Sequence, residues 1–321
     1  MSKLEQLRAM TTIVADTGDI DAIKHYNPTD ATTNPSLILL AADKPQYSHL
    51  IEDAVSFCKS KATSSGQEIR LLMQKLFVNF GVEILKIIPG RVSTEVDAHL
   101  SFDVKGSIEG ARNLISLYEQ HKVPKERVLI KLASTWEGTQ AARVLEKEGI
   151  HCNMTLMFSL TQAIECAEAG ATLISPFVGR ILDWYKKTEE VKGYPPDEDP
   201  GVKSVNEIFN YFKKFDYPTQ VMGASFWNKE EILELAGCDL LTISPLLLEE
   251  IRNEEGELSR KLDPEKAKEL DIEKVDMDEN KFRWGLNTSA MATEKLAEGI
   301  RKFAVDHEKL ENMIVESHFY S

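Results

Sequence analysis

The segment RVLIKLAS, at residues 127 to 134, is a short apolar run of the kind that forms a buried parallel β-strand, and it carries Lys131 at its centre. Seven other short β-rich runs occur along the chain. Helical patterns separate most of them, so we expect parallel pairing through crossover helices, and eight such units close a barrel. The sequence therefore predicts a (β/α)8 TIM barrel with extra helices. The other runs are TTIVADTG (11 to 18), DATTNPS (30 to 36), GRVSTEVD (90 to 97), HCNMTLMF (151 to 158), ATLISPFVG (171 to 179), TQVMGASF (219 to 226) and LLTISP (240 to 245).

The segments between these runs have helical patterns with recognisable ends. One helix is expected from Thr135 to Gly149 and another from Ser159, a plausible N-cap, to Gly170, and each ends at a glycine. We interpret residues 1–321 as a single catalytic domain in which the last helix packs over the barrel. Two polar stretches, 191 to 201 and 253 to 280, are expected to be solvated surface insertions. Longer helical patterns cover roughly 45 to 63, 67 to 88, 107 to 121, 202 to 215 and 288 to 308.

Composition limits the partners and the compartment. The 321 residues carry a formal charge of -14, from 38 basic and 52 acidic residues, which disfavours nucleic acid and anionic membrane surfaces. A phosphorylated substrate would need individually placed cationic or N–H donors. The four cysteines lack C-x-x-C spacing, as in reduced cytosolic proteins, and no stretch approaches the ~20 apolar residues of a membrane span. The N-terminus also lacks an apolar signal core, so we expect a cytoplasmic protein.

Lys131 is the strongest indication of chemistry. A charged ammonium inside a strand that is buried on both faces is costly unless it is paired or loses its proton. A buried amine that has lost its proton is a nucleophile, and it attacks carbonyl groups to form a Schiff base. Taken alone, Lys131 also fits a lysine that extends to solvent at a strand end or forms a structural ion pair.

Polar residues occupy similar places in other predicted strands. Asp16 ends the first apolar run, Glu95 follows Ser93 at a spacing of two, and Thr155 follows Asn153 in the same way. Residues two apart point to one face of a strand, and the carboxyl ends of barrel strands build the active site. Two acids and an amine meeting there suit carbonyl chemistry with proton transfer. Each acid, taken singly, could instead be a strand-end or turn carboxylate.

These stretches together resemble the transaldolase family over nearly the whole chain. The matching segments, in family order, are VADTGD, DATTNPSLIL, STEVDA, IKLASTWEG, CNMTLMFS, SPFVGRILDW, VMGASF and LAGCDLLTISP. The resemblance implies a barrel with the Schiff-base lysine on the fourth strand, a position that Lys131 takes. It also implies transfer of a dihydroxyacetone unit from fructose 6-phosphate to erythrose 4-phosphate, in the non-oxidative pentose phosphate pathway. No metal or organic cofactor is implied, and family habit suggests a homodimer.

The resemblance also assigns roles to individual residues. Asp16 is implied as the acid–base group at carbon–carbon cleavage, and Glu95 and Thr155 as holders of the water that serves Schiff-base formation and hydrolysis. Arg180 matches a phosphate-binding arginine. The residues implied to bind substrate hydroxyls are Asn34, Asn153 and Ser175, with Phe177 beside them.

One position departs from the family pattern. Family members usually carry an arginine directly after ASF, whereas this chain reads Ser225, Phe226, Trp227, Asn228. Tryptophan cannot supply a bidentate cationic fork, so the phosphate would rest on Arg180, Ser225 and nearby backbone donors. We expect weaker binding of phosphorylated substrates or a shift toward unphosphorylated ones, unless another cation compensates.

Three other functions compete with a transaldolase. A class I aldolase that releases dihydroxyacetone shares every feature up to the choice of acceptor, and only the resemblance favours transfer. A metal-dependent barrel hydrolase is disfavoured because the seven histidines show no H-x-H or H-E-x-x-H spacing. A non-catalytic sugar-binding barrel gains some support from Trp227.

Overall fold

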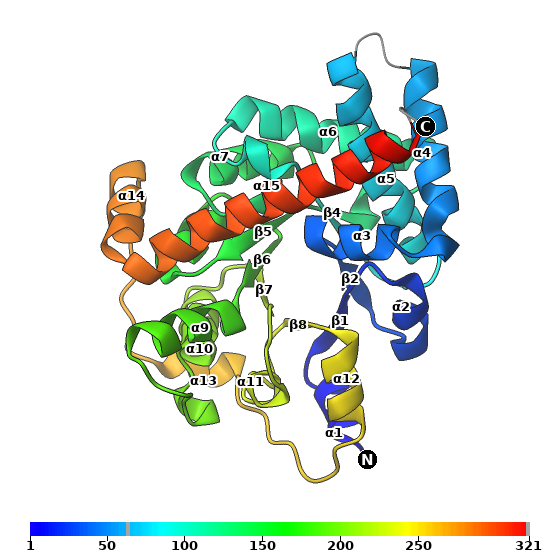
Figure 1. Ribbon diagram of the computed structural model, residues 1–321. Helices are drawn as coiled ribbons and strands as arrows, with labels where there is room; N and C mark the ends of the chain where they lie inside the picture. The colour runs from blue at the N-terminus through cyan, green and yellow to red at the C-terminus, as the bar shows by residue number, and fades with distance from the viewer. Residues whose placement is uncertain (62–64, 319–321) are drawn as a thin grey trace.

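Eight parallel strands form a closed barrel in which each strand pairs with its neighbours in sequence and β8 returns to β1 (Figure 1). The computed structural model describes residues 1–61 and 65–318. The closed sheet of eight parallel strands confirms the predicted TIM barrel. The strands are β1 Thr12–Asp16, β2 Asp30–Thr32, β3 Val92–Glu95, β4 Val128–Ala133, β5 Cys152–Met157, β6 Leu173–Pro176, β7 Gln220–Gly223 and β8 Leu240–Ile243.

Helices surround the barrel and connect its strands (Figure 1). The predicted helices from Thr135 and Ser159 are present, and glycines with positive φ, Gly149 and Gly170, follow them. Residues 62 and 63 of the predicted helix 45 to 63 lie outside the described residues. The helices are α1 Lys3–Arg8, α2 Ile20–Tyr26, α3 Pro35–Ala42, α4 Ser48–Lys61, α5 Ser65–Leu85, α6 Val104–Gln120, α7 Trp136–Lys147, α8 Leu160–Glu168, α9 Val178–Thr188, α10 Pro200–Lys214, α11 Lys229–Leu233, α12 Pro245–Arg252, α13 Pro264–Glu269, α14 Glu279–Thr288 and α15 Ala290–His318, with single 3₁₀ turns η1 Pro45–Tyr47, η2 Ala98–Leu100, η3 Lys125–Arg127 and η4 Pro196–Glu198.

Three predicted strands were wrong at their carboxyl ends, and one of them, 219 to 226, already ends at Gly223. The run 30 to 36 leaves the sheet after Thr32, because the Asn34 side chain accepts a hydrogen bond from the Leu37 N–H and Pro35 starts α3. This is a standard helix start, in which proline occupies a position whose N–H would have no partner. The run 171 to 179 likewise ends at Pro176, and Val178 begins α9, a helix that the pattern did not predict.

The barrel interior is layered along the strand direction. An apolar layer in the middle separates polar groups at the two ends. At the amino ends of the strands, Arg91 donates to Asp30 and Gln220. The polar layer at the carboxyl ends contains Lys131, two residues beyond the apolar layer on β4. The apolar layer consists of Val14, Leu129, Leu173, Met222 and Leu240.

The C-terminal helix α15 runs across the face of the barrel (Figure 1). Its apolar residues Leu296, Ile300 and Phe303 pack with Leu156 and other residues at the carboxyl ends of the strands. A side chain at Gly299 would lie 2.6 Å from Leu156 Cδ2, so glycine is required for this close approach.

The insertions and the cysteines behave as their composition indicates. Residues 253 to 280 are mostly exposed, although they include α13 and bury Leu262 and Ala267. The four cysteines are free and buried. No helix in the described ranges combines the length and the apolarity that a membrane span needs.

Candidate active site

Lys131 lies in the middle of the polar layer and is almost fully buried. Its Nζ donates a hydrogen bond to the Thr33 carbonyl at 3.0 Å and lies 3.2 Å from Glu95 Oε2. The pairing of β3 with β4 places Glu95 directly beside Lys131. The structure thus brings together the amine and one of the two predicted acids, with the ion pair shielded from solvent.

Two buried oxygens near this pair are without hydrogen-bond partners among the described residues: Glu95 Oε2 and Thr155 Oγ1. Thr155 lies on β5, the strand next to that of Lys131. Burial raises the pKa of Glu95, and the charge of Lys131 opposes this shift. Buried polar atoms of this kind are normally satisfied by water or ligand, so Thr155 Oγ1, and Glu95 Oε2 in addition to its ion pair with Lys131, can bind a substrate or a water.

Asp16, the second predicted acid, is held by hydroxyl groups. Thr32 Oγ1 donates to Asp16 Oδ1 at 2.9 Å, and Thr32 Oγ1 lies 2.6 Å from Thr242 Oγ1. Burial raises the pKa of Asp16, while Lys131, Thr32 and Arg180 act against that shift. Sequence reasoning missed both threonines, although each lies at a spacing of two from other inward-facing residues of its strand.

Asn153 forms a hydrogen-bonded chain across three strands. Ser175 Oγ donates to Asn153 Oδ1 at 2.5 Å, and Asn153 Nδ2 donates to Ser93 Oγ at 3.1 Å. Asn153 is fully buried beneath the cavity surface, whereas Ser175 reaches the cavity. The chain fixes the orientation of the Asn153 amide and of the Ser175 hydroxyl.

A cavity of about 380 Å³ opens at the carboxyl ends of the strands and contains Lys131 and Asp16. Glu95 and Asn153 do not line the cavity. Glu95 contacts Lys131 and Asn153 contacts Ser175, and both of these partners are lining residues. Leu246 and Glu250, on α12, also line the cavity; neither was predicted, because the helix that carries them was not predicted either. The other predicted residues that line this cavity are Asn34, Thr155, Ser175, Phe177, Arg180, Ser225 and Trp227.

At the mouth of the cavity, the Arg180 guanidinium packs against two aromatic rings. Its guanidinium carbon lies 4.9 Å from the centre of the Phe177 ring and 5.6 Å from that of Phe303. No hydrogen bond or ion pair holds its guanidinium within the described parts of the chain. Burial lowers the pKa of Arg180, and nearby carboxylates, first Glu298, oppose the shift. Such a group is suited to bind an anion.

Trp227 lies at the same mouth and is 55% exposed. Its indole Nε1 donates to Asp183 Oδ2 at 2.9 Å, and its ring covers Gly179 at the start of α9. The tryptophan therefore occupies a fixed place on α9 and adds no positive charge to the mouth.

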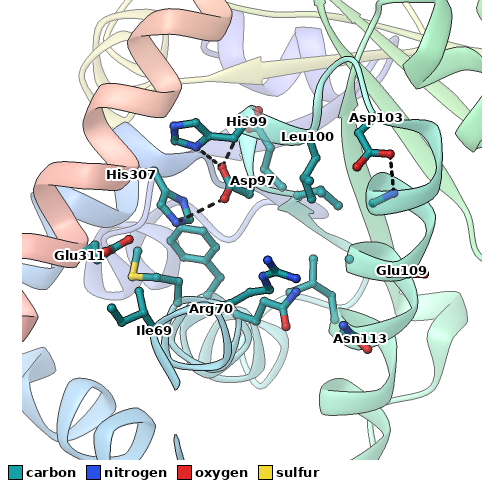
Figure 2. Close-up of a pocket in the computed structure, with 18 of the residues that line it drawn as sticks. Ile69, Arg70, Asp97, His99, Leu100, Asp103, Glu109, Asn113, His307 and Glu311 are labelled. Carbon is teal, nitrogen blue, oxygen red and sulfur yellow. Dashed lines mark hydrogen bonds and ion pairs between the residues drawn. The ribbon is translucent and has the colours of Figure 1, made fainter. Parts of the chain in front are cut away.

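A second cavity, of about 460 Å³, lies between α5, α6, η2 and α15 (Figure 2). In Figure 2 the side chains of Asp97, His99 and His307 point toward one another, and His99 Nδ1 lies 2.8 Å from Asp97 Oδ1. Glu95 lines this cavity, but Lys131 and Asp16 do not. Among the described residues no group of three or more His, Cys, Asp or Glu is arranged to hold a metal ion. Lys131 and Asp16 line the first cavity, and Glu95 contacts Lys131 there, so we take the first cavity as the candidate active site.

A parallel barrel with a buried amine between two carboxylates at the carboxyl ends of its strands defines a class: barrel enzymes equipped for carbonyl chemistry on a lysine. A family profile described as Transaldolase/Fructose-6-phosphate aldolase matches residues 13–314. This chain belongs to that family, as its resemblance predicted.

Individual relatives are similar over almost their whole length. "Transaldolase" from Protochlamydia amoebophila is 67% identical across 98% of this chain and 97% of that protein. "Probable transaldolase" from Drosophila melanogaster is 60% identical across 98% and 95%. "Transaldolase" from Homo sapiens is 57% identical across 99% and 95%.

Proposed function

We propose that this protein is a transaldolase that moves a dihydroxyacetone unit from a ketose phosphate to an aldose phosphate through a Schiff base on Lys131. The single observation that carries the proposal is the position of the Lys131 amine, buried and 3.2 Å from Glu95, in a cavity that also contains Asp16. The names of its relatives support the same activity. The donors expected are fructose 6-phosphate and sedoheptulose 7-phosphate, and the acceptors are erythrose 4-phosphate and glyceraldehyde 3-phosphate.

The first step is capture of the ketone. The amine of Lys131, once it has given up its proton, attacks C2 of the ketose, and loss of water from the carbinolamine gives an iminium ion. Glu95 Oε2 and Thr155 Oγ1 accept no hydrogen bond from the described residues, and Glu95 lies beside the amine, so we assign to these two residues the water that leaves and later returns.

The second step is cleavage of the carbon–carbon bond. Asp16 takes the proton of the C4 hydroxyl, the C3–C4 electrons move to the iminium nitrogen, and an aldose phosphate leaves. A raised pKa brings Asp16 nearer to neutral pH, which suits a group that accepts and returns a proton. The remaining enamine adds to the acceptor in reverse. Since Lys131 is the electron sink throughout, the reaction requires no cofactor.

The remaining lining residues hold the substrate. Asn34 and Ser175 offer hydrogen bonds to sugar hydroxyls, with Asn153 orienting Ser175 and Phe177 forming the wall beside them. At the mouth, Arg180 and Ser225 receive the phosphate. Because Trp227 supplies no charge, we infer weaker phosphate binding than an arginine would give.

Borohydride reduction in the presence of fructose 6-phosphate tests the Schiff base. We expect a stable mass adduct that maps to Lys131, and loss of both the adduct and the turnover, by about a thousandfold or more, in Lys131→Met. Lys105→Met, which changes an exposed lysine of the second cavity, is the matched control and should behave as the unaltered enzyme. An adduct on another lysine, or undiminished turnover in Lys131→Met, would refute the proposal.

The aldolase alternative remains relevant because the family description names both activities. The two are separated by incubating fructose 6-phosphate with and without erythrose 4-phosphate. A transaldolase forms sedoheptulose 7-phosphate only when the acceptor is present, whereas an aldolase releases free dihydroxyacetone without it.

We further infer a cytoplasmic homodimer. Four free cysteines and the acidic charge support a reducing compartment and the absence of nucleic-acid or membrane partners. The dimer rests on the family resemblance alone. Light scattering of the purified protein would test it, since a monomer mass at working concentration would contradict it.

A further inference from the structure

Glu231 is a buried carboxylate directly behind the mouth of the active site. It is 1% exposed and belongs to α11. Its Oε2 accepts a hydrogen bond from the Trp227 N–H at 2.7 Å. Its Oε1 is buried and has no hydrogen-bond partner among the described residues. A buried carboxylate that is only half satisfied is costly, so its charge state responds strongly to its surroundings.

The groups that face Glu231 are themselves acidic. Asp199, at the start of α10, and Asp183, on α9, both disfavour its ionisation. No ion pair neutralises any of these three carboxylates within the described ranges. The nearby cation Lys229 is engaged elsewhere, 2.7 Å from Glu254. Burial first, and then the two aspartates, raise the pKa of Glu231 to about 7.

Only a short loop separates this carboxylate from the cavity. Ser225 and Trp227 line the cavity, while the backbone N–H of Trp227 binds Glu231 on the other side. The loop is fixed against α9, since the Ser225 carbonyl accepts from the Gly179 N–H at 2.7 Å. Ser225 has a φ of 59°, in the left-handed region. An anion that contacts Ser225 at the cavity surface would therefore be separated from the Glu231 carboxylate by this loop, and a charge buried behind the loop is screened less than a charge in water.

We propose that Glu231 is a second specificity-determining residue at the mouth: its negative charge opposes the anionic end of the substrate, so phosphorylated sugars bind best when Glu231 carries a proton. The inference rests on the proposed function, in which the phosphate lies at Arg180. Binding of the anion then takes up a proton at Glu231, and affinity for the anion falls as pH rises through neutrality.

A purely structural role makes a different prediction. Asn228 caps α11 by accepting from the Glu231 N–H at 2.9 Å, and Glu231 could serve only to hold this turn. Glu231→Gln separates the roles, because glutamine keeps an oxygen that accepts from the Trp227 N–H but carries no charge. Glu230→Gln removes the neighbouring, exposed carboxylate and is the matched control.

Sulfate is a suitable probe because it remains a dianion from pH 6 to pH 8, unlike a phosphate ester. The measurement is competitive inhibition by sulfate of turnover with fructose 6-phosphate. We expect Glu231→Gln to bind sulfate roughly tenfold more tightly than the unaltered enzyme at pH 8, as expected for one charge removed at close range, with little difference at pH 6. Glu230→Gln should match the unaltered enzyme at both pH values.

Equal sulfate inhibition by the unaltered enzyme and Glu231→Gln at pH 8 would overturn the inference, as would weaker inhibition in Glu231→Gln. If Glu231→Gln does not fold, Trp227→Arg provides the test. An arginine at this position should offset the carboxylates and remove most of the pH dependence of sulfate inhibition. An unchanged pH dependence in Trp227→Arg would also overturn the inference. Borohydride trapping at Lys131 in the same samples keeps this outcome separate from a failure of the proposed function.

Discussion

The two ends of the active-site cavity are built differently. At the reacting end, Lys131, Glu95 and Asp16 lie on the barrel strands β4, β3 and β1 and contact other side chains or backbone of the barrel. At the mouth, Arg180 forms no ion pair with any residue that the structure describes, and Trp227 and Leu246 are 55% and 70% exposed. Strand pairing fixes the reacting geometry, whereas helices and a loop supply the mouth. The residues at the mouth can therefore change without disturbing Lys131, Glu95 and Asp16.

Trp227 illustrates this freedom. Its indole is anchored by Asp183 and packs on Gly179, both on α9, so the substitution is accommodated entirely outside the barrel strands. We expect changes at the reacting end to reduce kcat strongly and changes at the mouth to act mainly on KM.

Apart from Lys131→Met, the largest effect is expected from Asp16→Asn. Loss of a positioned proton acceptor should lower kcat by about 10²- to 10⁴-fold. Borohydride should still trap fructose 6-phosphate on Lys131, because the Schiff base forms before Asp16 acts. Asp21→Asn, an exposed carboxylate on α2, is the control. Near-normal kcat in Asp16→Asn would remove this residue from the cleavage step.

Arg180→Met should affect the opposite end of the cavity. Removal of a charge-assisted contact should raise KM for fructose 6-phosphate by about 10- to 100-fold, while kcat changes little. Unphosphorylated fructose should be used equally well by both proteins. A similar loss on both sugars would show that Arg180 supports the fold of the mouth and does not bind phosphate.

Trp227→Arg should strengthen the binding of phosphorylated sugars at the mouth. An added cation next to Arg180 and Ser225 should lower KM for phosphorylated sugars by roughly tenfold and leave KM for plain sugars unchanged. Equal KM values in the two proteins, for both kinds of sugar, would count against a role of this position in phosphate binding.

The smallest effect concerns the pH dependence of the reacting end. Asp16 must be ionised to act as a base, so activity is lost as pH falls through its pKa, which burial raises above the ordinary value. The hydrogen bond from Thr32 opposes that rise. In Thr32→Val the acid limb of the kcat profile should therefore move to higher pH. A shift to lower pH would contradict the assignment of that limb to Asp16.

The sequence alone was sufficient for the barrel and for most of the reacting end. Eight apolar runs separated by helical patterns determine the closed sheet, and a spacing of two identifies which residues of a strand face its interior. Lys131 stands out because an amine in a buried strand is costly. The positions of Asp16 and Glu95 relative to Lys131 then follow from their places near the carboxyl ends of strands.

Only the tertiary structure decided the surroundings of these groups. The contact of Thr32 with Thr242, the placing of Phe303 against Arg180 and the burial of Glu231 behind Trp227 join segments that are distant in the chain or lie in loops. Local periodicity carries no information about such contacts, because they depend on how helices and loops pack over the ends of the strands. The buried amine could thus be predicted from the sequence itself, whereas the charge balance at the mouth arises from the packing of helices and loops.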